Sequence, residues 1–189
     1  MNIRAKSEKG FSLIELLVVV AIIGVLAAVG VVGYQGYIDS TKKSVTDANA
    51  KAVHQWLVNT KTVRAAGIDV DPSACSNSTG NLESGTTPAS ATSASGCFQK
   101  IASSGGPFES FKNPYKTSRT GTTAIRATTS VSAVAASTAC TTLHAGSEMG
   151  DIIIRVSGNG AAHLDVYFCA KVDGTDNRLT KRDTTITSF

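Results

Sequence analysis

A run of 23 residues from Phe11 to Gly33 contains one charged side chain, that of Glu15. As a helix rising about 1.5 Å per residue, this run would span roughly 34 Å, which is enough to cross a bilayer. The preceding leader, residues 1–10, carries three bases and one acid, and the positive-inside rule places such a segment in the cytoplasm. The sequence therefore predicts a transmembrane segment at residues 11–33 and places residues 34–189 outside the cytoplasm.

Glu15 is unexpected in a plain membrane anchor. An acid at the centre of a spanning helix costs about 2.5–3.5 kcal/mol, and less near the end, where Glu15 lies. Two interpretations stay open. Glu15 is either an interfacial acid tolerated one turn into the helix, or it pairs with a positive group when the helix packs against copies of itself, because an unpaired charge in an apolar bundle is costly.

The junction of Gly10 and Phe11, the acid Glu15 and the apolar run that follows resemble the N-terminus of type IV pilins and related pseudopilins. In that family a membrane peptidase cuts after the glycine and methylates the new N-terminal residue. The resemblance implies cleavage between Gly10 and Phe11 and an N-methylated Phe11. It also implies that Glu15 neutralises the Phe11 amine of a neighbouring subunit during assembly. Tyr34 and Tyr37 match the usual tyrosines of the family.

Val32 departs from the family pattern, because many members have a helix-loosening proline at this position. Glycines remain at Gly24, Gly30, Gly33 and Gly36, and each weakens a helix by about 0.8–1.0 kcal/mol relative to alanine. We predict local loosening of the helix between Gly24 and Gly33 in an assembled fibre. A filament map with unbroken helix through this stretch would contradict it.

The second half of the helix, residues 34–66, has apolar or small residues at three- and four-residue spacing, which is the period of one helix face. These residues are Tyr34, Ile38, Thr41, Val45, Ala48, Ala52 and Trp56. We expect this face to pack on a sheet. The helix should run from about Phe11 to Arg64 and stop near Gly67, because glycine is a common C-terminal signal.

The head beyond the helix changes in character twice. Residues 67–120 are rich in turn formers and small polar residues, which predicts a surface loop between helix and sheet. Its segment 112–115, Lys-Asn-Pro-Tyr, is similar to a turn in major pseudopilins. Residues 121–189 contain β-branched and aromatic runs that predict strands at 122–128, 151–157 and 163–170, with a hairpin turn at 158–160. The predicted fold is α+β, with the outer half of the long helix packed on an antiparallel sheet of three to four strands.

Four cysteines in an exported chain without a C-x-x-C pair indicate two disulfides rather than a metal site. Of the three pairings, Cys75 with Cys97 and Cys140 with Cys169 close the shortest loops. Each would contribute roughly 3 to 4 kcal/mol by loop entropy. The second pair would correspond to the C-terminal disulfide that the resemblance to pilins implies.

No enzyme motif is found in the head, and we expect neither catalysis nor a cofactor. The three histidines, His54, His144 and His163, lack the spacing of metal ligands and accompany no nucleophile or phosphate-binding motif. The turn at 173–177 contains two Asp residues and an Asn residue, but it supplies too few oxygens for calcium by itself.

The charge of the chain is modest. The precursor carries +4, and removal of residues 1–10 leaves +2, which is too little to indicate nucleic-acid binding. A local patch repeated along a filament could still form a basic track for DNA. Its candidate members are Lys171, Arg178, Lys181 and Arg182.

Three functions remain as hypotheses. The favoured one is the structural subunit of a type IV pilus, acting in adhesion, motility or DNA uptake. The alternatives are a pseudopilin of a type II secretion or competence system, and a low-copy tip subunit that binds DNA or a surface ligand. The resemblance implies a membrane-bound precursor that later joins an extracellular homo-oligomeric filament. It also implies a prepilin peptidase, an inner-membrane platform protein, an assembly ATPase acting indirectly and, with two membranes, a secretin as partners.

Overall fold

The computed structural model describes residues 10–68, 98–99, 101–128, 138–157, 163–172 and 175–186. The leader up to Lys9, Cys75, Cys97, the hairpin turn at 158–160 and the first two residues of the 173–177 turn lie outside this range. The chain divides into two compact units, residues 1–40 and 41–189. One helix, α1 (Leu13–Ala65), contributes to both units.

Within the first unit, α1 exposes apolar side chains all round. Phe11, Leu13 and Val29 are at least 70 % exposed, and the glycines of this segment leave the helix continuous in the single chain. Among the described residues, one helix is long and apolar enough to cross a membrane, with a window of mean hydropathy 3.0. The predicted loosening between Gly24 and Gly33 concerns the fibre and stays a prediction.

The end of α1 follows the predicted glycine signal. Gly67 has a φ of +81°, a left-handed conformation that costs a glycine little. The Ile68 amide donates a hydrogen bond of 3.2 Å to the Val63 carbonyl, the 6→1 bond of a Schellman motif. The prediction that the helix stops near Gly67 is confirmed.

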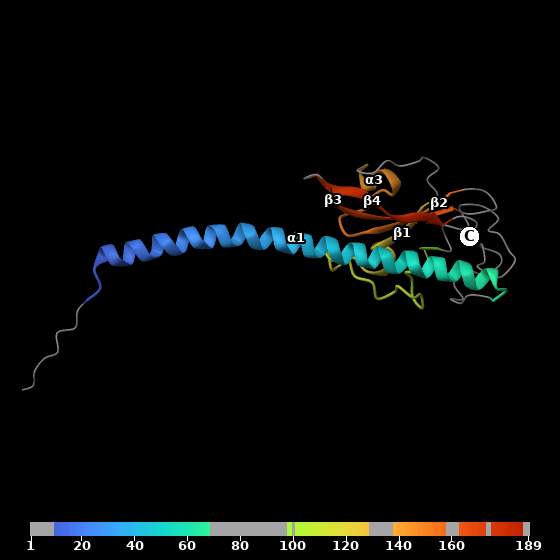
Figure 1. Ribbon diagram of the computed structural model, residues 1–189, viewed down its shortest axis with the longest axis horizontal. Coiled ribbons are helices and arrows are strands. Elements are labelled where there is room, and N and C mark those ends of the chain that lie inside the picture. Colours follow the sequence, from blue (N-terminus) through green and yellow to red (C-terminus); the bar gives the residue numbers. More distant parts are fainter. Residues whose placement is uncertain are drawn as a thin grey trace, which may run out of the picture. The chain divides into compact units, whose positions relative to one another are not determined.

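Within the described residues, four strands form the sheet of the second unit in the order β1-β2-β3-β4 (Figure 1). They are β1 (Ile125–Thr128), β2 (Ile152–Ser157), β3 (His163–Val172) and β4 (Thr175–Ile186). A short 3-10 helix, η1 (Gly121–Thr123), precedes β1, and a one-turn helix, α3 (Cys140–Leu143), lies between β1 and β2 in the chain.

The α+β prediction is confirmed, but the sheet is mixed. Strands β2, β3 and β4 pair antiparallel as expected, whereas β1 pairs parallel to β2. A parallel pair needs a long crossover, and here 23 residues that include α3 separate Thr128 from Ile152. Strand β4 was not predicted, because its only large apolar residues are Leu179 and Ile186.

Two apolar layers cover the faces of the sheet. On one face, Ile152, Ile154, Val166 and Phe168 join the buried residues of α1 in the main core. On the other face, Ile153, Tyr167 and Leu179 pack with Cys140 and Leu143 of α3. Because successive strand residues point to opposite faces, the two clusters place the sheet between α1 and α3.

The face of α1 that packs on the sheet is not the predicted one. The buried side chains are Thr46, Ala50, Val53, His54, Leu57 and Thr60. This stripe is displaced by one residue, about 100° around the helix, from the predicted set. Val45 is 43 % exposed and Ala48 and Ala52 are exposed. Only the predicted Trp56 packs against the core, with its ring centroid 6.1 Å from that of Phe108.

The choice of the buried face of α1 has a physical reason. Leu57 is the one leucine between residues 34 and 65. The stripe that it forms with Val53 and Ala50 buries more apolar surface than one built on alanines. Thr46 joins the stripe at little cost because its hydroxyl donates to the Lys42 carbonyl at 2.8 Å. The residues at positions 45, 48 and 52 therefore indicated the wrong face, whereas Trp56 lies at its border and contacts the core.

Candidate functional site

The N-terminal end of α1 is organised by Ser12 and Glu15. Gly10, Phe11 and Ser12 are not helical, and the helix begins at Leu13. The Ser12 amide donates to Oε2 of Glu15 at 2.9 Å, and the Leu16 amide donates to the Ser12 carbonyl at 3.2 Å. The spacing Ser-x-x-Glu is that of a capping box, in which the acid satisfies the amide of the N-cap residue. The role of Glu15 in capping the helix was not predicted from the sequence, although the spacing of Ser12 and Glu15 is the pattern that indicates a capping box.

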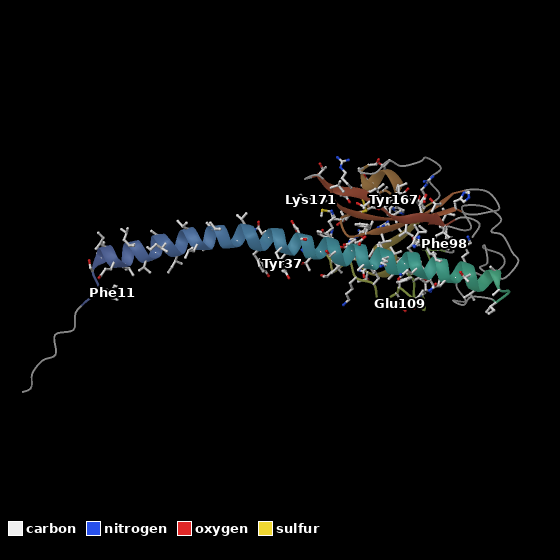
Figure 2. The ribbon with its side chains drawn as sticks, viewed as in Figure 1. Phe11, Tyr37, Phe98, Glu109, Tyr167 and Lys171 are labelled. Atoms are coloured by element: carbon white, nitrogen blue, oxygen red, sulfur yellow. A yellow bond between two sulfur atoms is a disulfide. The ribbon has the colours of Figure 1, made fainter. Side chains whose placement is uncertain are left out.

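Phe11 lies just before the helix and is 82 % exposed (Figure 2). Together with Ile14, Glu15, Val18 and Val19 it lines an open hollow of about 430 Å³. All five residues belong to the first two turns of α1 or to the residues before it. The bond between Gly10 and Phe11, where cleavage was predicted, is therefore flanked by exposed, non-helical residues.

Residues 5–31 match the model of the prokaryotic N-terminal methylation motif. The chain carries the class III signal peptide of type IV pilins. The motif supports a precursor of the pilin or pseudopilin kind and indicates a structural subunit. It also implies processing by a prepilin peptidase, and together with the apolar helix it fits a membrane-anchored precursor. No curated protein and no solved structure matches the chain.

The disulfide between Cys140 and Cys169 confirms one of the two predicted pairs. It joins α3 to β3 with a Cα–Cα distance of 6.0 Å across 29 positions of sequence. The residues just before Cys140 also pair with β4, because the Leu179 amide donates to the Thr138 carbonyl at 2.8 Å. The disulfide thus holds in place the segment at Thr138 and Ala139, which pairs with Arg178 and Leu179 on the edge of β4 that does not face β3. The pair Cys75 and Cys97 lies outside the described residues and stays a prediction.

The predicted basic patch is divided by the sheet. Arg178 lies opposite Ala170, which belongs to the α1 side, whereas Lys181 lies opposite Tyr167, on the α3 side. Lys171 is exposed at a register shift between Ala170 and Val172. Arg182 is described by its backbone alone, at the position opposite Val166. Strand alternation therefore places Arg178 and Lys181 on different faces.

Lys181 also has an acidic partner, Asp165. Its Nζ lies 2.6 Å from Oδ1 of Asp165, and the guanidinium of Arg155 lies 3.1 Å from Oδ2. Thr185 donates to the same carboxylate at 2.6 Å. Burial alone would raise the pKa of Asp165, but hydrogen bonds from Lys181 and Thr185 and the charges of Lys181 and Arg155 lower it below its usual value. Part of the predicted cationic charge thus compensates a buried acid.

A second polar network fixes the turn at 112–115. Asn113 is buried, and its Oδ1 accepts the amides of Tyr115 and Lys116 at 2.8 and 3.1 Å, as in an Asx turn. Its Nδ2 donates to the buried Asp151 and to the Met149 carbonyl, each at 2.8 Å. The turn is thus tied to the residue just before β2.

Arg119 completes this network. Its Nε and Nη2 donate to the two carboxylate oxygens of Asp151 at 3.0 and 2.5 Å. The hydrogen bond to Asp151 raises the pKa of Arg119 despite its partial burial. On the surface, the hydrogen bond from Lys116 lowers the pKa of Glu148. The turn at Asn113 was recognised from the sequence, but the pairing of Arg119 with Asp151 was not. One acid and one base far apart in sequence form no motif that would predict their contact.

The three histidines lie in different places. His54 is buried on α1, His144 follows α3 beside Arg126, and His163 is exposed at the start of β3. Asn177, from the turn considered for calcium, lies in β4 and donates to the Ser147 carbonyl at 2.9 Å. Among the residues that the structure describes, no three His, Cys, Asp or Glu side chains gather as metal ligands.

Proposed function

We propose that this chain is the structural subunit of a type IV pilus, which polymerises through its apolar helix into an extracellular filament for adhesion, motility or DNA uptake. The observation that carries the proposal is the class III signal followed by a helix whose apolar side chains are exposed on all sides. Outside lipid such a helix requires cover from other helices, and copies of the same chain supply it in a filament.

In this proposal Phe11 becomes the methylated N-terminal residue after cleavage at Gly10, and its amine meets Glu15 of a neighbouring subunit. The open hollow beside Glu15 supports the pairing, because it leaves this side of the helix accessible to another chain. An inner-membrane platform protein, an assembly ATPase acting indirectly and, in a cell with two membranes, a secretin complete the proposed partners.

Intact-mass and N-terminal mass spectrometry of filaments sheared from expressing cells tests the proposal. The expected species is abundant, begins at N-methyl-Phe11 and lacks four hydrogens because two disulfides have formed. A processed chain that is abundant in membranes but absent from sheared material would contradict a pilus shaft.

The alternative of a pseudopilin is favoured by one specific feature, the turn at 112–115. Its sequence is similar to a turn of major pseudopilins, and in this head Asn113 and Asp151 build it rigidly into the fold. A pseudopilin would be processed at the same bond but would not form long surface fibres. Copy number in sheared fibres separates this alternative, and that of a low-copy tip subunit, from the favoured function.

DNA binding stays a hypothesis with its own experiment. Purified filaments should bind duplex DNA in a salt-dependent manner if a basic track runs along them. A variant with Lys171, Arg178, Lys181 and Arg182 replaced by serine should then bind more weakly. Equal binding by both filaments would exclude this patch as the DNA site.

A further inference from the structure

The guanidinium of Arg119 lies among five oxygen atoms from two segments of the head. Its Nε and Nη2 donate to the two carboxylate oxygens of Asp151 at 3.0 and 2.5 Å. Nη2 also donates to the carbonyl of Thr123 at 2.6 Å and to the carbonyl of Gly146 at 3.3 Å. Nη1 forms an ion pair with Oε1 of Glu148 at 3.6 Å. We call these five oxygens the Arg119 cage.

The oxygens of the cage are of the kinds that bind a hard cation. Ca²⁺ takes about six to eight oxygen ligands from carboxylates, backbone carbonyls and water, and one carboxylate can supply two of them. The side chain of Asp151 is fully buried and that of Arg119 is 13 % exposed, so water does not compensate the acid. A buried carboxylate requires a cationic partner, and here the partner is a guanidinium of the same chain.

Contacts other than those with Arg119 also position the cage. Thr123 is the last residue of η1, and the carbonyls at the end of a helix have no partner within the helix. Oδ1 of Asp151 also accepts from the Asn113 side chain at 2.8 Å, and Oδ2 accepts from the Glu148 amide at 2.9 Å. These two bonds would keep both carboxylate oxygens in place without the guanidinium.

Two other cations lie near the cage. The Nζ of Lys116 donates to the carboxylate of Glu148 at 3.0 Å, from a side chain that is 55 % exposed. The guanidinium of Arg126 lies beside His144, with Nη1 3.2 Å from the ring nitrogen Nδ1. Among the residues that the structure describes, Arg119 alone brings a positive charge into contact with Asp151.

We propose that the Arg119 cage is a cation site that the chain fills with its own guanidinium, and that removal of this guanidinium opens the site to Ca²⁺. In the unaltered chain, Arg119 then joins η1 to the segment before β2 without a metal ion. The stability of the head should therefore not depend on the calcium concentration outside the cytoplasm. This inference concerns the head alone, and it holds whether or not the chain forms a pilus.

Thermal unfolding of the full chain in detergent tests the proposal, with Arg119→Ala measured in EDTA and in calcium. In EDTA the variant should unfold roughly 10 °C below the unaltered chain, because Asp151 stays buried without its counter-charge. Calcium at about 10 mM should raise the midpoint of the variant by about 3–6 °C, the shift expected for a Kd near 1 mM. Magnesium should raise it less, because Mg²⁺ requires a tighter octahedral shell. The unaltered chain should unfold at the same temperature in calcium and in EDTA.

Arg155→Ala is the matched control, because it also removes a guanidinium from a buried carboxylate, that of Asp165. Calcium should leave its midpoint unchanged, since Lys181 still contacts Asp165. A calcium response of Arg119→Ala no larger than that of Arg155→Ala would overturn the proposal, and so would an equal response of the unaltered chain. If Arg119→Ala does not fold in EDTA, folding restored by calcium supports the proposal, whereas a chain that stays unfolded in calcium overturns it.

Discussion

Asp165 is a buried acid with two basic partners. Because its folded pKa is lowered, its ionised form stabilises the fold at pH values above its unfolded pKa of about 3.9. This stability is lost as the pH falls through the lower, folded pKa. We predict that the free energy of unfolding decreases below about pH 4, measured by urea titration of the full chain in detergent.

Asp165→Asn is the matched variant for this prediction. The amide keeps the shape of the side chain but removes the titrating group, so the acid dependence should become shallower. At neutral pH the variant should be less stable by roughly 3–5 kcal/mol, because it leaves Arg155 and Lys181 without their buried counter-charge. An identical acid dependence in both proteins would show that Asp165 is not the group responsible.

Gly150 is required by the turn at Asn113. Its φ is +86°, and an added Cβ would lie 2.2 Å from Asn113 Oδ1 and 2.9 Å from the Tyr115 ring. Gly146 has a similar φ of +75°, but a Cβ there would meet nothing within 4 Å. We predict that Gly146→Ala costs about 1–2 kcal/mol from backbone strain alone, and that Gly150→Ala costs clearly more.

Thermal unfolding of both glycine variants measures the difference. Because the two positions share the same strain, the excess cost of Gly150→Ala reports the contact with Asn113. Equal midpoints would contradict the close packing of this turn.

At the scale of elements, the free edge of β1 is closed by one side chain. Gln99 Nε2 donates to the Ile125 carbonyl at 2.8 Å, and its Oε1 accepts the Ala127 amide at 2.9 Å. These are the bonds that a neighbouring strand would make, so Gln99 protects an edge that is otherwise open to pairing with other chains.

We predict that Gln99→Leu destabilises the head by about 1–3 kcal/mol, because the Ala127 amide and Ile125 carbonyl lose their partners. Hydrogen exchange at the Ala127 amide should become faster. Gln99→Glu is the matched control, because its carboxylate still accepts from Ala127 but cannot donate to Ile125. Unchanged exchange in the Leu variant would exclude this role of Gln99.

The sequence predicted elements better than it predicted their orientation. The limits of α1 follow from its apolar run and from Gly67, and β2 and β3 follow from β-branched runs. The buried face of α1 could not be predicted, because two apolar stripes of similar period compete on the helix. Strand β4 was missed because an edge strand with Arg178 and Lys181 has the composition of a turn.

At the scale of the whole molecule, the candidate site was predictable in part. Gly10, Phe11 and Glu15 were proposed as site residues because they lie within one short motif, at residues 5–31. Their roles in cleavage, methylation and assembly stay predictions. The pairing of Lys181 with Asp165 was not predictable, because it depends on the register of two strands. A charge count along the sequence cannot distinguish a free cation from one that compensates a buried acid.

Glu15 has two roles that a pair of variants can separate. In the single chain it caps α1 through the Ser12 amide, whereas in the proposed filament its charge meets the Phe11 amine of a neighbour. Glu15→Gln keeps an oxygen that can accept from Ser12 but has no charge, and Glu15→Ala removes both. We predict that both variants insert into the membrane and that both give at least tenfold less sheared filament than the unaltered chain.

The comparison between the two variants decides which role matters. If charge pairing drives assembly, as proposed, restoring the cap with Gln does not restore filaments, because an amide gains little from a neighbouring ammonium in an apolar bundle. Normal filaments from Glu15→Gln together with few from Glu15→Ala would show that Glu15 acts through the helix cap. Normal filaments from both variants would show that assembly does not depend on Glu15. The packing of the apolar helices would then be the main source of filament stability.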